Sequence, residues 1–86
     1  MRVQILGPSS ANCLKLEIIV RASLAELGMR DARVERVTQP QETRHLLWGE
    51  PPGLAIDGQL VWSGGNPLPT KDWIRQVLRE TILMPA

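Results

Sequence analysis

The stretch LAIDGQLVW at residues 54–62 is the feature that most constrains the fold. Two apolar runs flank Asp57-Gly58, and this dipeptide readily supplies the positive φ angles that a type I′ turn needs at both of its central positions. The sequence therefore predicts an antiparallel β-hairpin here, and the other elements are arranged around it.

Two further strands and a helix are predicted before the hairpin. Apolar and polar residues alternate in RVQIL (2–6), and Gly7-Pro8 ends that strand. The segment ARVERV (32–37) is also strand-like, but its three charges are typical of an edge strand protected against pairing with other chains. Between the two, a helix is predicted over 11–27, capped by Ser9 or Ser10 and stopped by Gly28. Its apolar face is formed by Cys13, Leu16, Val20, Leu24 and Leu27.

Two more helices complete the order. Thr38 is predicted to cap a short helix that runs to about Leu47, and Thr70 to cap the last one. The last helix has an apolar stripe of Ile74, Val77, Leu78 and Ile82. The order β-α-β-α-β-β-α predicts an α/β fold in which the first two strands are parallel and the hairpin strands antiparallel. We expect a mixed four-stranded sheet flanked by three helices, in a single domain over residues 1–86.

Composition and charge exclude several classes of function. Ten basic and nine acidic side chains give a net charge of +1 and no basic stripe, so we expect no nucleic-acid partner. No apolar run approaches the roughly 20 residues that cross a bilayer. The absence of a signal-peptide pattern and the single cysteine favour a cytoplasmic protein. One thiol does not make a metal site within a single chain, and nothing further in the sequence supports a cluster shared across a dimer, so we expect neither a metal nor another cofactor.

Three stretches resemble the small thioredoxin-like proteins called redox-active disulfide proteins. VQILGPSSANCLKLE is similar to their opening, in which a strand ends in Gly and leads into Cys-Ala-x-Cys-x-x-Leu. PPGLAIDGQLVWSG is similar to their Thr-Pro-Ala-Leu-x-Ile-Asp-Gly run, which contains a cis-proline, and PTKDWIRQVL to their terminal helix. The resemblance covers about residues 1–83 and implies a thioredoxin-like fold.

The resemblance also implies site residues. Ser10 takes the place of the exposed nucleophilic cysteine, and Cys13 matches the second, resolving cysteine. Pro52 matches the cis-proline that packs against the active-site turn, and Pro51 replaces the threonine before it.

The serine at position 10 removes the first step of dithiol exchange. That step needs a thiolate at the helix N-terminus, whose attack gives a mixed disulfide that a second thiol resolves. An oxygen cannot form the disulfide, and a serine nucleophile would need a general base. The only histidine, His45, falls in the predicted second helix and not in the turn. Ser10 is therefore interpreted as a helix cap.

Cys13 and Pro51 each allow two interpretations. Cys13 is either a small core residue on the buried helix face or a monothiol that forms mixed disulfides with glutathione or a protein. Pro51 either removes the N–H group with which this position binds an extended substrate, or simply fixes the geometry of the loop.

A contact surface is predicted on the first helix. Leu14 and Ile18 lie one turn apart, outside the face of Leu16 and Val20. They form an outward apolar stripe that contacts a partner, or they are ordinary scattered exposed residues, or the last helix covers them. A homodimer through this helix is one form of such contact. Trp48, beside Pro51-Pro52, is predicted either to extend this contact surface or to line the former substrate groove, whereas Trp62 and Trp73 are assigned to the core.

Two functions from different classes follow. The leading hypothesis is a degenerate thioredoxin-like protein that lacks dithiol–disulfide turnover and acts as a binding or accessory module for a protein partner. The alternative is a monothiol redox protein that uses Cys13 for exchange with a small thiol.

Overall fold

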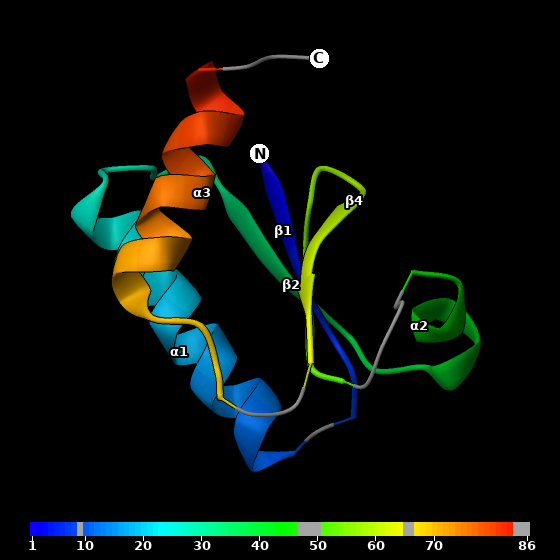
Figure 1. The fold of residues 1–86 in the computed structure, drawn as a ribbon. Coiled ribbons are helices and arrows are strands. Elements are labelled where there is room, and N and C mark those ends of the chain that lie inside the picture. The colour runs from blue at the N-terminus through cyan, green and yellow to red at the C-terminus, as the bar shows by residue number, and fades with distance from the viewer. Residues whose placement is uncertain (9, 47–50, 65–66, 84–86) are drawn as a thin grey trace.

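The computed structural model describes residues 1–8, 10–46, 51–64 and 67–83 of the chain. The elements are β1 (Arg2–Leu6), α1 (Ala11–Glu26), β2 (Arg33–Val37), α2 (Pro40–Leu46), β3 (Gly53–Ile56), β4 (Gln59–Ser63) and α3 (Lys71–Leu83) (Figure 1). The strands form one sheet in the order β2-β1-β3-β4, in which β1 and β2 are parallel and the other neighbours antiparallel. The predicted element order and mixed four-stranded sheet are confirmed, and β2 lies at an edge.

The hairpin turns where the sequence predicts. Asp57 and Gly58 both have positive φ angles, 50° and 85°, and Ile56 pairs with Gln59 across the two-residue turn. The pairing is irregular further along, because Leu54 faces Trp62 while Ala55 faces Leu60. Val61 is therefore the extra residue of a β-bulge in β4.

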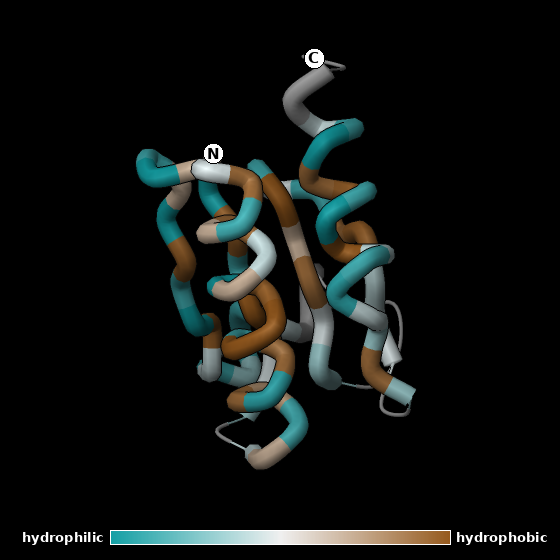
Figure 2. Tube along the Cα trace, turned by 90° about the vertical axis from the view of Figure 1, so that its left-hand side faces the viewer, coloured by the Kyte–Doolittle hydropathy of each residue, from teal (hydrophilic) through white to brown (hydrophobic). Residues whose placement is uncertain are grey.

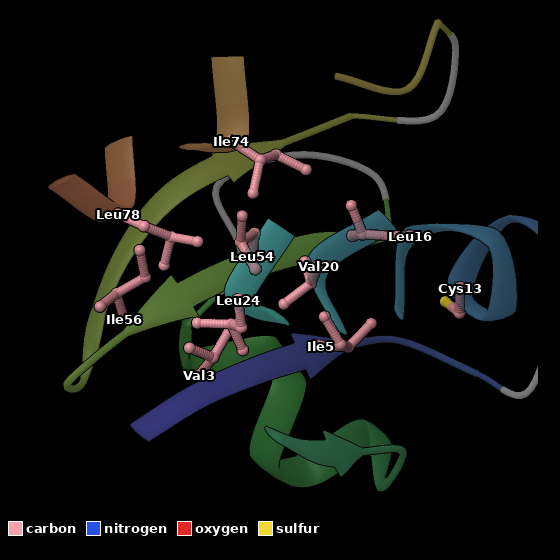
Figure 3. Packing of buried hydrophobic residues seen from close by; sticks show 10 residues of the cluster. All are labelled: Val3, Ile5, Cys13, Leu16, Val20, Leu24, Leu54, Ile56, Ile74 and Leu78. Carbon is pink, nitrogen blue, oxygen red and sulfur yellow. The ribbon is translucent and has the colours of Figure 1, made fainter. Parts of the chain in front are cut away.

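Helices cover both faces of the sheet. Figure 1 shows α1 and α3 on one face and α2 on the other. The main core lies under α1 and α3 and joins residues of these helices to β1 and β3 (Figure 3): Val3, Ile5, Cys13, Leu16, Val20, Leu24, Leu54, Ile56, Ile74 and Leu78. A smaller cluster of Leu6, Val37 and Ala55 lies on the other face. The predicted apolar face of α1 is thus buried as far as Leu24, and Leu27 is half-buried.

The helix starts are set by local hydrogen bonds. Ser10, with extended φ and ψ angles of −115° and 166°, is the N-cap of α1. Thr38 is not the cap of α2, contrary to the prediction. The helix begins at Pro40, and the Gln39 carbonyl accepts from the N–H groups of Glu42 and Thr43. Proline is favoured at the first helical position because no helical partner awaits its missing N–H.

Trp73 is a second correction. The sequence assigned it to the core, but its side chain is 37% exposed at the start of α3. The next residue, Ile74, is fully buried instead. Trp62 is half-buried and packs against the main core.

The two helices on the same face differ in the distribution of their apolar residues. In Figure 2, which looks onto this face, hydrophobic segments run through the middle of α1, whereas α3 alternates between hydrophilic and hydrophobic segments.

No helix in the described part of the chain combines the length and the apolar character needed to cross a membrane.

Ion pairs join the end of α1 to the start of α3. The Glu26 carboxylate accepts from Lys71 Nζ at 2.7 Å and from Arg75 Nη1 at 3.0 Å. The hydrogen bond from Lys71, with the charges of Lys71 and Arg75, holds the pKa of the Glu26 carboxyl below its ordinary value of 4.5.

This lowered pKa predicts a pH dependence of stability. Because the pKa is lower in the folded than in the unfolded state, the ion pairs stabilise the fold above about pH 4.5, and this contribution is lost as the pH falls through the folded-state value. Glu26→Gln should therefore lower the thermal unfolding midpoint slightly near pH 7, as exposed pairs do, and the difference from the parent should shrink near pH 3. Glu80→Gln is the control. An equal difference at both pH values would contradict the prediction.

Candidate functional site

The candidate site begins where β1 passes into α1. Gly7 has a φ of +140°, and its N–H donates to the Val37 carbonyl at 2.9 Å, which extends the β1–β2 pairing by one residue. The chain then turns, with the Ser10 N–H donating to the Pro8 carbonyl at 2.8 Å. Ser9 lies outside the described residues. The turn places Ser10 at the head of α1.

Both oxygens of Ser10 are used in the first turn of the helix. Its hydroxyl oxygen accepts from the Cys13 N–H at 3.3 Å, and its carbonyl accepts from the Leu14 N–H at 3.0 Å. A side-chain oxygen at this position satisfies one of the N–H groups that have no partner within the helix. Ser10 is half-buried and is held by the helix that it caps.

Cys13 lies one turn into α1 and belongs to the main core. Its side chain is 3% exposed. Figure 3 shows it at the end of the cluster nearest the helix N-terminus, with the sulfur directed toward the other core residues. The remaining thiol of the motif is therefore packed inside the fold and not displayed at the surface.

The second part of the site is the segment before β3. The peptide bond between Pro51 and Pro52 is cis. Pro52 is fully buried, and its carbonyl accepts from the Gly64 N–H at 3.1 Å, whereas Pro51 is exposed. An extended segment that approaches Pro51 meets a carbonyl acceptor but no N–H donor at this residue.

Gly7 brings the two parts together. A Cβ atom on Gly7 would lie 2.9 Å from the Pro51 Cβ, 3.0 Å from the Cys13 sulfur and 3.7 Å from the Pro52 Cα. The strand end, the helix start and the proline turn thus meet at one point, and only the lack of a side chain on Gly7 allows it. Sequence reasoning missed this role and treated Gly7 as the end of a strand.

The other predicted residues lie as follows. Leu14 and Ile18 are exposed by 44% and 67%, so α3 does not cover them. His45 lies in α2, which covers the opposite face of the sheet from α1 (Figure 1). Trp48 lies outside the described residues.

The chemistry available at the site is limited. Residues 7–14 and 51–56 contain no acidic, basic or histidine side chain, so neither segment supplies a general base for Ser10. In the described ranges, no three His, Cys, Asp or Glu side chains are grouped closely enough to hold a metal ion.

Comparison with known proteins agrees with this architecture. A family profile described as a thioredoxin domain matches residues 1–79. A curated thioredoxin from Methanothermobacter thermautotrophicus is 35% identical over 78 residues, which cover 91% of this chain and 97% of that protein. No solved structure gives a significant match. Since the family match and the relative both span nearly the whole chain, the protein belongs to the thioredoxin family.

Proposed function

We propose that this protein is a thioredoxin-family member that no longer turns over dithiols and disulfides and instead acts as a binding or accessory module. The observation that carries the proposal is the Ser10–Cys13 pair. An oxygen occupies the N-cap where exchange would begin, and the side chain of the single cysteine is 3% exposed in the core.

The burial of Cys13 also speaks against the monothiol alternative. Exchange requires a thiolate to approach a disulfide sulfur in line, form a mixed disulfide and release the other sulfur as a thiolate. The Cys13 side chain is 3% exposed, belongs to the main core and lies 3.0 Å from where a Cβ on Gly7 would stand, so the folded protein offers an incoming disulfide little access to this sulfur.

The reactivity of the Cys13 thiol separates the two functions. The binding-module proposal predicts a slow reaction in the folded protein, and the monothiol alternative predicts a fast one. In the folded protein, Cys13 should react with a small aromatic disulfide reagent at least about a hundredfold more slowly than in denaturant, because reaction must wait for local opening of the core. The measurement is the reaction rate at rising denaturant concentration, with a short peptide that contains the segment ANCLK as the free-thiol reference. A rate near that of the peptide without denaturant would establish the monothiol mechanism.

The exposed residues near the site support a binding role. Leu14 closes the first turn of α1 by its hydrogen bond to Ser10, and with Ile18 it forms an outward apolar stripe beside the site. Pro51 is exposed at the position where thioredoxin-like proteins bind an extended segment, and it offers only an acceptor. A protein partner that packs on Leu14 and Ile18 is the contact these features favour, and a second copy of the chain is one such partner.

Self-association through this stripe is open to a direct test. If two copies meet through α1, the sedimentation coefficient should rise with protein concentration in the parent and stay constant in Ile18→Lys. Lys15→Ala, on an exposed neighbouring position, is the control. Constant sedimentation of the parent would leave a different protein as the partner.

Turnover is the test of the whole proposal. The native protein, supplied with dithiothreitol, should reduce insulin disulfides no faster than dithiothreitol alone. Cys13→Ala should behave identically, which excludes a small contribution from the buried thiol. A native rate clearly above both would defeat the proposal.

A further inference from the structure

A pocket of about 530 Å³ lies away from the Ser10–Cys13 site, toward the other end of α1. Its lining comes from the C-terminal half of α1, the turn that begins at Gly28 and the edge strand β2. The turn exists because Gly28 takes a φ of +70°, which reverses the chain after the helix. The volume lies within the roughly 300–1,000 Å³ typical of small-molecule sites.

The floor of the pocket is apolar. Leu24 is 6% exposed and belongs to the main core, and Met29 and Val34 are half-buried and pack against it. These side chains offer hydrocarbon and thioether surface, against which the apolar part of a ligand gains about 25 cal/mol for each Å² of its surface removed from water.

The rim of the pocket is positively charged. Arg21 and Arg30 both line it, and no carboxylate is among the described residues that do. The Arg21 Nε group donates to Glu17 at 2.9 Å, which anchors the guanidinium and leaves its two terminal nitrogens for a ligand. Arg30 forms no ion pair with any described residue. Guanidinium groups match carboxylate and phosphate oxygens by paired hydrogen bonds.

The C-terminal end of α1, which borders the pocket, repels an anion only weakly. The last carbonyls of a helix carry partial negative charge, but three of them at this end already accept hydrogen bonds within the turn. Leu27, Gly28 and Met29 donate to the carbonyls of Ser23, Ala25 and Leu24, respectively. The two arginines therefore determine the sign of the charge that the pocket favours.

We propose that this pocket binds a small amphipathic anion, in which a carboxylate or phosphate head contacts Arg21 and Arg30 and an aliphatic or aromatic body lies on Leu24, Met29 and Val34. The binding is independent of the thiol site. A small ligand is favoured over a protein because the pocket has the volume of a single small-molecule site.

The test is a titration of the full chain, followed by backbone amide NMR, with octanoate, octyl phosphate and octanol below their aggregation concentrations. Octanoate or octyl phosphate should shift the amide signals of Gly28, Met29 and Val34 and bind at least about fivefold more tightly than octanol. The stronger of the two anions identifies the preferred head group.

Two pairs of variants make the test specific. Arg30→Gln should weaken the anion by about two- to fivefold, and Arg79→Gln, which removes the same charge from α3, should leave the affinity unchanged. Ala25→Glu should abolish binding, because a glutamate four residues after Arg21 would form an ion pair with the Arg21 guanidinium in place of the ligand. Ala25→Gln, which adds no charge, should still bind. Equal affinity for octanol, shifts confined to other parts of the chain, or the same loss in Arg79→Gln as in Arg30→Gln would each overturn the proposal.

Discussion

Ser10→Cys should turn a chain with one buried thiol into one that closes an internal disulfide. The Ser10 hydroxyl lies 3.3 Å from the Cys13 backbone nitrogen, so a sulfur at position 10 would stand beside the first turn that holds Cys13. On addition of oxidised dithiothreitol, the two thiols should lose two protons and two electrons to the reagent and form one S–S bond. Thiol titration in denaturant should then find no free thiol, against two after reduction.

The stability of this variant should change in opposite directions in its two redox states. Reduced Ser10→Cys should be less stable than the parent by about 1 kcal/mol, because the serine cap is lost. The oxidised form should recover up to about 2 kcal/mol, the chain-entropy contribution of so short a loop. Ser10→Ala is the control for the cap alone. If the two cysteines stay reduced in oxidant, position 10 does not lie where the structure places it.

Gly7→Ala should cause a larger loss of stability than the same substitution at Gly28, Gly58 or Gly64. The new Cβ would lie within 3.0 Å of both the Pro51 ring and the Cys13 sulfur, and it would also require a φ of +140° that an L side chain rarely adopts. Overpacking and backbone strain each cost about 1–3 kcal/mol, so the free energy of unfolding should fall by about 2–6 kcal/mol.

A second glycine separates the two causes. Gly28 also has a positive φ, +70°, but a Cβ there meets nothing within 4 Å. Gly28→Ala should therefore show backbone strain alone, about 1–2 kcal/mol. The measurement is equilibrium unfolding in urea. Adding Cys13→Ala to Gly7→Ala should return part of the loss, and equal effects of the two glycine substitutions would contradict the contact at Gly7.

The elements predicted correctly are those fixed by neighbours in sequence. Asp57-Gly58 specifies its turn by the backbone angles that these residues adopt, and the apolar spacing from Cys13 to Leu24 specifies which side of α1 is buried. Ser10 caps the helix through a residue three positions away. Such signals are local, so they were visible without knowledge of the fold, and the resemblance to thioredoxin-like proteins added the fold family and the site residues.

The features that the sequence did not predict depend on distant contacts. Gly7 matters because Pro51 and Cys13 approach it from other parts of the chain. Ile74, the first residue of the predicted apolar stripe of α3, fills the core position, and Trp73 beside it is exposed although its size favoured the core. Arg21 and Arg30 share a pocket only because the turn at Gly28 folds the chain back beside α1.

The irregular pairing in β4 has a consequence for behaviour at high concentration. β4 is an edge strand without any charged side chain, so it lacks the device that protects β2. The extra residue, Val61, twists the strand and interrupts the even spacing of its outward N–H and C=O groups. A neighbouring molecule therefore finds no continuous template for an intermolecular ladder, and the bulge acts as a safeguard against fibril growth from this side.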